Sequence, residues 1–279
     1  DSEFVPNASA LSLSADESYL SVAQAHKLFV ELGVQAAGNQ YSIVDTAEHI
    51  ATEYHAAVTD STLNVVDTEN NTDLGTLTLS ENSASGLSVA DAMLLVDTLH
   101  VNLNGHTYAV TDTVQHILDN ATDAALTGAG VSGISLSAGQ TDAGQTDADL
   151  AGLSFAQAHT LVETLHVDLG SLVYTINDQA QTILQHADGT TVTGADSITI
   201  TGQLQGSLSD AYVLLDDLNA TVDSGFQMDV VDTANAILAA LSSYESTSTN
   251  VDLADAAVYT SISLSADESY LSVAQAHKL

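Results

Sequence analysis

The sequence predicts an α/β fold made of tandem repeats, each running strand, helix, strand, helix. Three observations predict it. The segment Ser12–Leu28 recurs residue for residue at Ser263–Leu279, a shift of 251 residues. Inside that span, alternating apolar pairs recur, and so does an aspartate that precedes a helical apolar pattern. Self-similarity of this kind is typical of repeat architectures, in which each unit stacks on its neighbours.

The first strand of each sub-repeat is expected where two apolar residues flank a Ser or Thr. These pairs are Leu11/Leu13, Leu77/Leu79, Ile134/Leu136, Ile198/Ile200 and Ile262/Leu264. They divide the chain into sub-repeats at residues 11–76, 77–133, 134–197 and 198–261. Residues 262–279 then begin the next 251-residue module, and residues 1–10 are interpreted as a leader or a cloning remnant.

The first helix of each sub-repeat is expected at a serine that has Gln or Asp three residues later, which is the spacing of a capping box. These serines are Ser21, Ser88, Ser154 and Ser207. A second strand should follow each helix. Its apolar pairs are Tyr41/Ile43, Tyr108/Val110, Tyr174/Ile176 and Met228/Val230.

The second helix is expected to begin at the repeated aspartate, which stands in stretches such as IVDTAEHI. Its carboxylate would accept the free amides of the first turn and suit the positive end of the helix dipole. The four copies are Asp45, Asp112, Asp178 and Asp232. We therefore predict that these aspartates are helix caps and not catalytic groups.

The strands alternate apolar residues with Ser or Thr, whereas a parallel sheet covered on both faces would have continuously apolar strands. The pattern therefore predicts a solenoid-like array with the helices on one face of a mainly parallel sheet. The other face would carry a row of hydroxyls that could contact another copy or a glycan. This contact face comprises Thr78, Ser80, Ser135, Ser137, Thr199 and Thr201. The alternative interpretation is that this row has no function. Thr is common in strands, and Ser keeps the exposed face soluble.

The composition excludes several classes of partner. The chain has 37 acidic residues against two lysines and no arginine, which gives a formal net charge of −35. Proteins that bind nucleic acid or anionic lipid rely on Lys and Arg, so both partners are excluded. No apolar run approaches the roughly 18 residues of a membrane helix. Cysteine is absent, which excludes disulfides and thiolate metal sites.

Two short motifs carry a family resemblance. The D-T-A-x-x-I pattern from Asp45 to Ile50, and the L-S-x-A-Q-A pattern from Leu20 to Ala25, resemble the tandem repeats of giant secreted bacterial surface proteins of adhesin or surface-layer type. The resemblance covers nearly the whole chain from Leu11 onward. It implies an exported, cell-surface, calcium-responsive and non-enzymatic protein. The glycine-rich calcium nonapeptide often found beside such repeats is absent from the sequence.

The usual signatures of catalysis are absent from the sequence. There is no G-x-S-x-G, no H-E-x-x-H and no phosphate-binding loop. The ten histidines include Asp97/His100 and Glu163/His166, which are spaced as helix neighbours. Both pairs fall at a helix end, where the dipole favours a histidine, and other histidines recur at equivalent repeat positions. We therefore predict that the chain is not an enzyme.

Calcium is the one cofactor that the residue pattern favours. Asp67, Glu69, Asn71 and Asp73 present oxygen side chains at alternate positions of a polar insertion, like the first ligands of a calcium loop. A second cluster, in a Gly-rich insertion, comprises Asp142, Asp147 and Asp149. Solvated acidic loops in an acidic protein are the alternative interpretation.

These observations predict a structural or adhesive repeat module of a large extracellular bacterial surface protein or filament, without catalysis. Its expected partners are neighbouring repeat modules or other copies of itself, and its expected location is the cell surface. The alternative hypothesis is a calcium-dependent module that binds carbohydrate or a surface. That alternative predicts clustered exposed aromatic residues, but Trp is absent and most Tyr residues fall at apolar strand positions.

Overall fold

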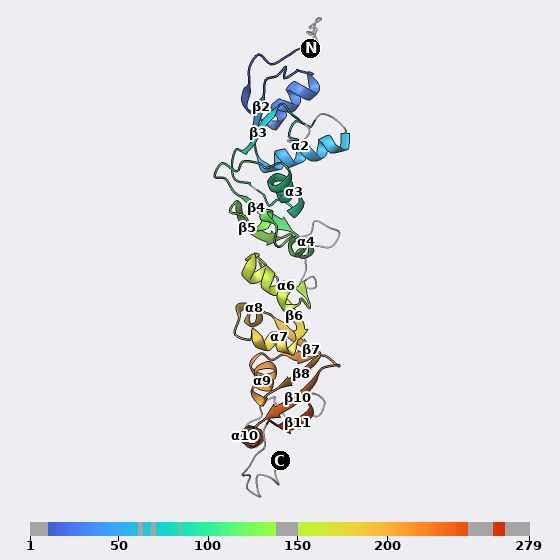
Figure 1. The fold of residues 1–279 in the computed structure, drawn as a ribbon, viewed down its shortest axis with the longest axis vertical. Coiled ribbons are helices and arrows are strands. Elements are labelled where there is room, and N and C mark those ends of the chain that lie inside the picture. Colours follow the sequence, from blue (N-terminus) through green and yellow to red (C-terminus); the bar gives the residue numbers. More distant parts are fainter. Residues whose placement is uncertain are drawn as a thin grey trace. The chain divides into compact units, whose positions relative to one another are not determined.

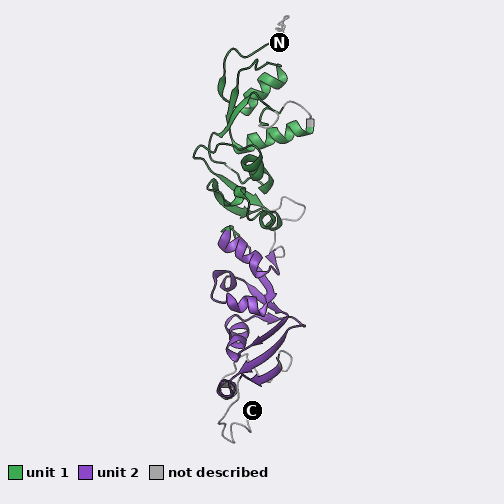
Figure 2. Ribbon diagram, in the orientation of Figure 1, with its two compact units in different colours: residues 1–145, 165–170 green, residues 146–164, 171–279 purple. Residues whose placement is uncertain are grey.

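The structure is a computed structural model, and it describes residues 11–60, 64–67, 71–83, 85–137, 150–244 and 259–265. The fold is mixed α/β, with parallel strands in several small sheets (Figure 1). The chain divides into two compact units (Figure 2). Unit 1 comprises residues 1–145 and 165–170, and unit 2 comprises residues 146–164 and 171–279.

The first helix of each sub-repeat begins after the expected serine and changes from α to π geometry after about one turn. The segments are α1 (Val22–Ala25) with η1 (His26–Glu31), α3 (Val89–Met93) with η2 (Leu94–Thr98), α6 (Phe155–His159) with η4 (Thr160–Thr164), and α9 (Leu208–Tyr212) with η5 (Val213–Asp217). Ser21, Ser154 and Ser207 complete capping boxes, which confirms the predicted starts. The π turns had no signal in the sequence. Because all four copies have one, we interpret them as part of the scaffold.

The second strand and the second helix of each sub-repeat also lie where the sequence predicts them. The strands are β2 (Tyr41–Asp45), β4 (Tyr108–Asp112), β6 (Thr175–Gln179) and β10 (Gln227–Asp232). We call these the exit strands. The helices are α2 (Ala47–Asp60), α4 (Val114–Asp119), α7 (Ala180–Gln185) and α10 (Ala234–Tyr244), and two further short helices are α5 (Ala124–Thr127) and α8 (Thr190–Thr193).

The first strands, which we call the entry strands, form at four of the five predicted pairs. They are β3 (Leu74–Leu79), β5 (Val131–Leu136), β7 (Ser197–Thr201) and β11 (Tyr259–Leu264). The strand expected at Leu11/Leu13 is reduced to a single parallel bridge between Ser12 and Gln35. Three short strands were not predicted: β1 (Glu17–Leu20), β8 (Gln203–Gly206) and β9 (Thr221–Val222).

Each small sheet combines strands from two consecutive sub-repeats. Every exit strand pairs in parallel with the entry strand of the next sub-repeat, as β2–β3, β4–β5, β6–β7 and β10–β11. The entry strands β3, β5 and β7 also pair with the segment that follows their own first helix, through Asn102, Asp168 and β9 respectively. We call these the post-helix segments. Main-chain hydrogen bonds therefore join each sub-repeat to the next.

The core lies between the helices and one set of strand side chains. In β2 and β4, buried residues alternate with half-buried ones, and Ile43 and Val110 are completely buried. Helix residues such as Ala25, Ile50 and Ile117 are equally buried. Within the described residues, no helix is both long and apolar enough to cross a membrane.

Candidate functional site

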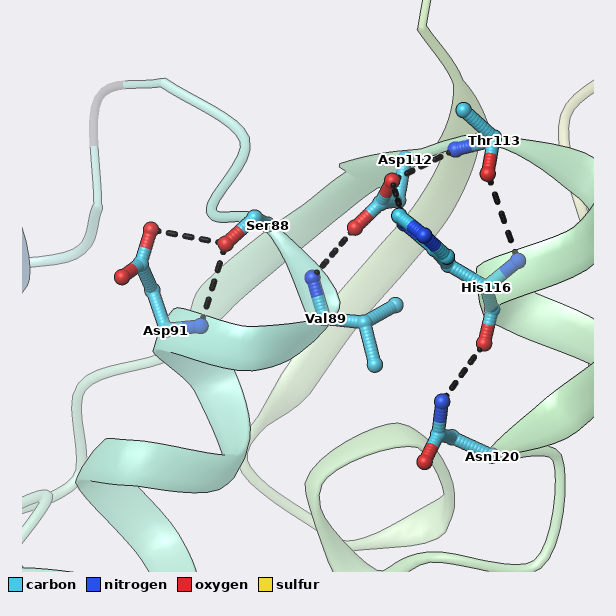
Figure 3. Close-up of polar contacts among 7 residues, drawn as sticks. All are labelled: Ser88, Val89, Asp91, Asp112, Thr113, His116 and Asn120. Atoms are coloured by element: carbon cyan, nitrogen blue, oxygen red, sulfur yellow. Dashed lines mark hydrogen bonds and ion pairs between the residues drawn. The ribbon is translucent and has the colours of Figure 1, made fainter.

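The repeated aspartate contacts the first helix of its own sub-repeat. Asp112 ends β4, and its Oδ2 accepts a hydrogen bond from the backbone N–H of Val89 at 2.8 Å (Figure 3). Its Oδ1 accepts from the N–H of Thr113 at 2.7 Å and contacts Nδ1 of His116 at 2.8 Å. Val89 is the first residue of α3, so the carboxylate satisfies an amide that has no partner inside the helix.

The same arrangement occurs in all four sub-repeats, and we call it the aspartate clip. The other three contacts are Asp45 Oδ2 to the N–H of Val22 at 2.8 Å, Asp178 Oδ2 to the N–H of Phe155 at 2.9 Å, and Asp232 Oδ2 to the N–H of Leu208 at 3.0 Å. Each clip ties the end of an exit strand to a helix that begins 23 or 24 residues earlier. The clip thus closes the chain segment between helix and strand with a charge-assisted hydrogen bond from the helix N-terminal amide to the carboxylate.

The prediction that these aspartates cap the second helix is therefore wrong, because each carboxylate accepts from the first amide of the first helix instead. The side-chain caps of α2, α4 and α10 come from the next residue: Thr46, Thr113 and Thr233 accept the N–H groups of His49, His116 and Ala236 at 3.2 Å. In the third sub-repeat, Gln179 takes this position and its side chain makes no capping bond. The aspartate is still a capping group, but for a helix that is distant in sequence.

Among the described histidines, His26, His49, His55, His116 and His159 each lie close to one carboxylate. His26 Nδ1 contacts Glu53 at 2.8 Å, and His55 Nε2 contacts Asp91 at 2.8 Å. His100 instead lies 3.0 Å from the carbonyl of Val96. Within the part of the chain that the structure describes, no group of three or more His, Cys, Asp or Glu side chains could hold a metal ion.

A cleft of about 290 Å³ lies in unit 1, between α2, the start of α3 and the end of β4. Its polar lining includes Glu48, His55, Ser88 and Asp91. Burial alone would raise the pKa of Glu48, but hydrogen bonds from Ser83 and Ser85 outweigh it and lower this pKa below its usual value.

The polar groups of this cleft do not form a nucleophilic triad. Ser88 Oγ donates to Asp91 Oδ2 at 2.7 Å, while His55 contacts the other oxygen of the same carboxylate. A serine nucleophile needs an imidazole on its hydroxyl, with the carboxylate behind the imidazole. Here the carboxylate lies between the two, so the hydroxyl is not activated.

The first of the two predicted calcium clusters is partly described. Asn71 is buried, and its amide nitrogen donates to the hydroxyl of Tyr41 and to the carbonyl of Asn64, while its oxygen accepts from the N–H of Asp73 at 3.2 Å. Asp67 and Asp73 are half-buried beside it. Glu69, Asp142, Asp147 and Asp149 lie outside the described residues. The Asn71 side chain therefore stabilises the loop through contacts with protein groups.

The predicted contact face is not a uniform row of free hydroxyls. Ser80 is exposed, whereas Thr78, Ser135, Thr199 and Thr201 are half-buried. Ser135 bonds to Thr111 at 2.9 Å, and Thr199 bonds to Thr221 at 3.1 Å. Ser137 was expected on the open face but is buried, with 3% of its surface exposed. Two of these hydroxyls, those of Ser135 and Thr199, thus bridge neighbouring strands.

A repeated tyrosine makes a polar contact that its sequence pattern did not predict, because the pattern placed it only among the apolar strand residues. The hydroxyls of Tyr41, Tyr108 and Tyr174 donate to the carbonyls of Val65, Ala125 and Thr191 at 3.0, 3.0 and 2.7 Å. Burial raises the pKa of Tyr41 and of Tyr108 to about 12. The fourth sub-repeat has Met228 at this position and cannot make the bond. The available signal was the recurrence of Tyr at or just before the start of an exit strand.

Comparison of the chain with models of protein families, with curated proteins and with solved structures finds no match.

Proposed function

We propose that this chain is a non-catalytic structural repeat module of a large extracellular bacterial surface protein or filament. In this proposal its sub-repeats stack as a solenoid-like array with the helices on one face. The observation that carries it is the pairing of each exit strand with the next entry strand, which repeats at four successive places. Sub-repeats that share a sheet are joined by main-chain pairing, and such joints would suit a spacer that must hold its length.

The use of the polar side chains supports the same proposal. The repeated aspartates, tyrosines and capping serines all bond to the main chain of the scaffold. The cleft in unit 1 contains no activated nucleophile, because Asp91 separates Ser88 from His55. An enzyme concentrates its reactive groups in one non-repeating cluster. Here the polar groups recur with the repeat, as a load-distributing scaffold would need.

The test of the stacked array uses covalent tandems of the 251-residue module in one, two and three copies. Small-angle scattering would measure the radius of gyration of each tandem. A stacked array predicts a radius that grows nearly in proportion to the number of copies. Units on flexible linkers would instead give growth close to the square root of that number, which would contradict the proposal.

Calcium-dependent binding is the second candidate, and the net charge of −35 favours it. Uncompensated negative charges repel one another in the folded state, so screening and cation binding both stabilise it. Thermal unfolding in calcium chloride and in sodium chloride at equal ionic strength separates the two effects. A specific site predicts a larger rise of the melting temperature in calcium, while equal rises would leave screening alone and remove this candidate.

A further inference from the structure

The short helix that follows the second helix has a different N-terminus in each unit. This helix is α5 in unit 1 and α8 in unit 2. In unit 2, Glu163 of η4 reaches it: the Oε1 atom accepts the N–H of Thr191 at 2.8 Å and also accepts the hydroxyl of Thr191. The residue before α8 is Gly189, which has no side chain to cap the helix. The first-turn amide is therefore open to the carboxylate of Glu163.

Unit 1 has a carboxyl group at both of these positions. The equivalent residues are Asp97 for Glu163, Asp123 for Gly189 and Ala125 for Thr191. Asp123 Oδ1 accepts the N–H of Ala125 at 2.8 Å, so this amide is already occupied. The carboxyl group of Asp97 is hydrogen-bonded to that of Asp123 instead. One of the two must then keep its proton, because an ionised carboxylate can only accept.

The titratable groups around this pair belong to η2, β4 and α3. Partial desolvation, then the charge of Asp123 and the hydrogen bond with it, raise the pKa of Asp97 above its usual value of 3.8, while the nearby His100 lowers it. Tyr108 of β4 stays neutral, because burial and the charges of the two aspartates raise its pKa to about 12. The acidic residue of α3, Asp91, lines the cleft described above. None of these groups is a permanent cation, so uptake of a proton neutralises the pair.

We propose that Asp97 and Asp123 form an acid-closed latch between η2 and α5, in which the two carboxyl groups share one proton. A fall in pH closes this contact because it replaces the repulsion of two negative charges with a hydrogen bond. The equivalent contact in unit 2 responds in the opposite direction, because Glu163 accepts from Thr191 most strongly when it is ionised. Acid therefore tightens one copy of this contact and weakens the other.

Asp97→Asn tests the latch, because its amide can donate to Asp123 at every pH. The latch stabilises the folded chain at low pH, and that contribution is lost as pH rises through the raised pKa of Asp97. At neutral pH the variant should therefore melt about 2 °C above wild type, and this advantage should shrink as pH falls through the pKa of Asp97.

Glu81→Gln is the matched control, because it removes one exposed negative charge from the same unit and so reports the general relief of repulsion. Thermal unfolding followed by circular dichroism measures wild type and both variants across this pH range. A melting temperature that Asp97→Asn raises no more than Glu81→Gln does would overturn the latch. An advantage that is the same at every pH would also overturn it.

Carboxyl-carbon NMR titration of the full chain tests the shared proton itself, and the resonance of Asp97 is identified by its loss in Asp97→Asn. Asp123→Asn keeps a capping oxygen but removes the negative charge, so it should lower the pKa of Asp97. Asp97→Glu/Asp123→Gly copies the pair of unit 2, and the introduced glutamate should titrate below its usual value of 4.5. A pKa of Asp97 that is not above 3.8 in the native chain, or that Asp123→Asn leaves unchanged, would overturn the proposal.

Discussion

The aspartate clips of unit 1 and unit 2 make the same main-chain bond in different surroundings. In unit 1, Asp45 and Asp112 each have a histidine four residues later, and His49 and His116 contact them at 2.7 and 2.8 Å. In unit 2, the residues in that position are Thr182 and Ala236, after Asp178 and Asp232.

The exposure of the carboxylates differs accordingly. Asp45 and Asp112 are buried at 9% exposure, while Asp178 and Asp232 are only half-buried. The bond to the first helix persists without the histidine, at 2.9 and 3.0 Å. The comparison therefore separates an essential contact, the one between the aspartate and the helix amide, from an accessory one that shields the carboxylate from water.

Loss of a clip should have the largest effect, and it should be larger in unit 1. Asp112→Ala leaves the N–H of Val89 without an acceptor at a buried place, and we expect a loss of about 3 kcal/mol of unfolding free energy. Asp178→Ala should lose about 1 kcal/mol, because water can reach the freed amide of Phe155. Urea unfolding followed by circular dichroism measures both. The exposed Asp196→Ala is the matched control, and a larger loss for Asp178→Ala than for Asp112→Ala would reverse the comparison.

The glycine before the first helix gives a second contrast between the units. An alanine Cβ at Gly86 would lie 1.8 Å from Thr111 Oγ1. At Gly152 it would lie 3.8 Å from Asn177 Cβ, but φ there is +68°. We expect Gly86→Ala to lose about 2 kcal/mol through overpacking, and Gly152→Ala about 1 kcal/mol through backbone strain. Thermal unfolding of the two variants measures the order. If Gly86→Ala lost no more stability than Gly152→Ala, Thr111 would have to move aside without cost, which would contradict the overpacking.

The accessory histidine should contribute less than the clip itself. His116 is largely exposed, so solvent screens its contact with Asp112, and we expect His116→Ala to lose less than about 1 kcal/mol. Thr182→His would place a histidine beside Asp178 and should make unit 2 resemble unit 1, with a gain of similar size. Urea midpoints at neutral pH measure both changes. A loss for His116→Ala as large as that for Asp112→Ala would make the histidine part of the essential contact.

The smallest expected effect is on how the melting temperature falls at low pH, through one glutamate in each unit. Hydrogen bonds from Thr191 lower the pKa of Glu163 in unit 2, and bonds from Ser83 and Ser85 lower that of Glu48 in unit 1. A carboxylate with a lowered folded pKa stabilises the protein above its ordinary value of 4.5 and loses that contribution as pH falls through the folded pKa. Glu48→Gln and Glu163→Gln should each flatten the decline of melting temperature below that pH. An unchanged acid profile in either variant would contradict that assignment.

The sequence was sufficient to predict the repeated elements but not their partners. The capping serines and the alternating strands were predictable because their signals are local, within three or four residues. The target of Asp112 was not, because the spacing to Val89 is 23 residues and an aspartate before a helix normally caps that helix. Burial of Ser137 and the pairing of Ser135 with Thr111 depend on which strands become neighbours, and strand alternation does not specify that.

Amide hydrogen exchange at the first residue of each first helix tests the central claim most directly. The amides of Val22, Val89, Phe155 and Leu208 lie in a turn whose N–H groups normally lack partners and exchange quickly. The account predicts that all four are protected in the native protein, and that Asp112→Ala removes the protection of Val89 while the other three amides keep theirs. Fast exchange of all four amides in the native protein would contradict the aspartate clip.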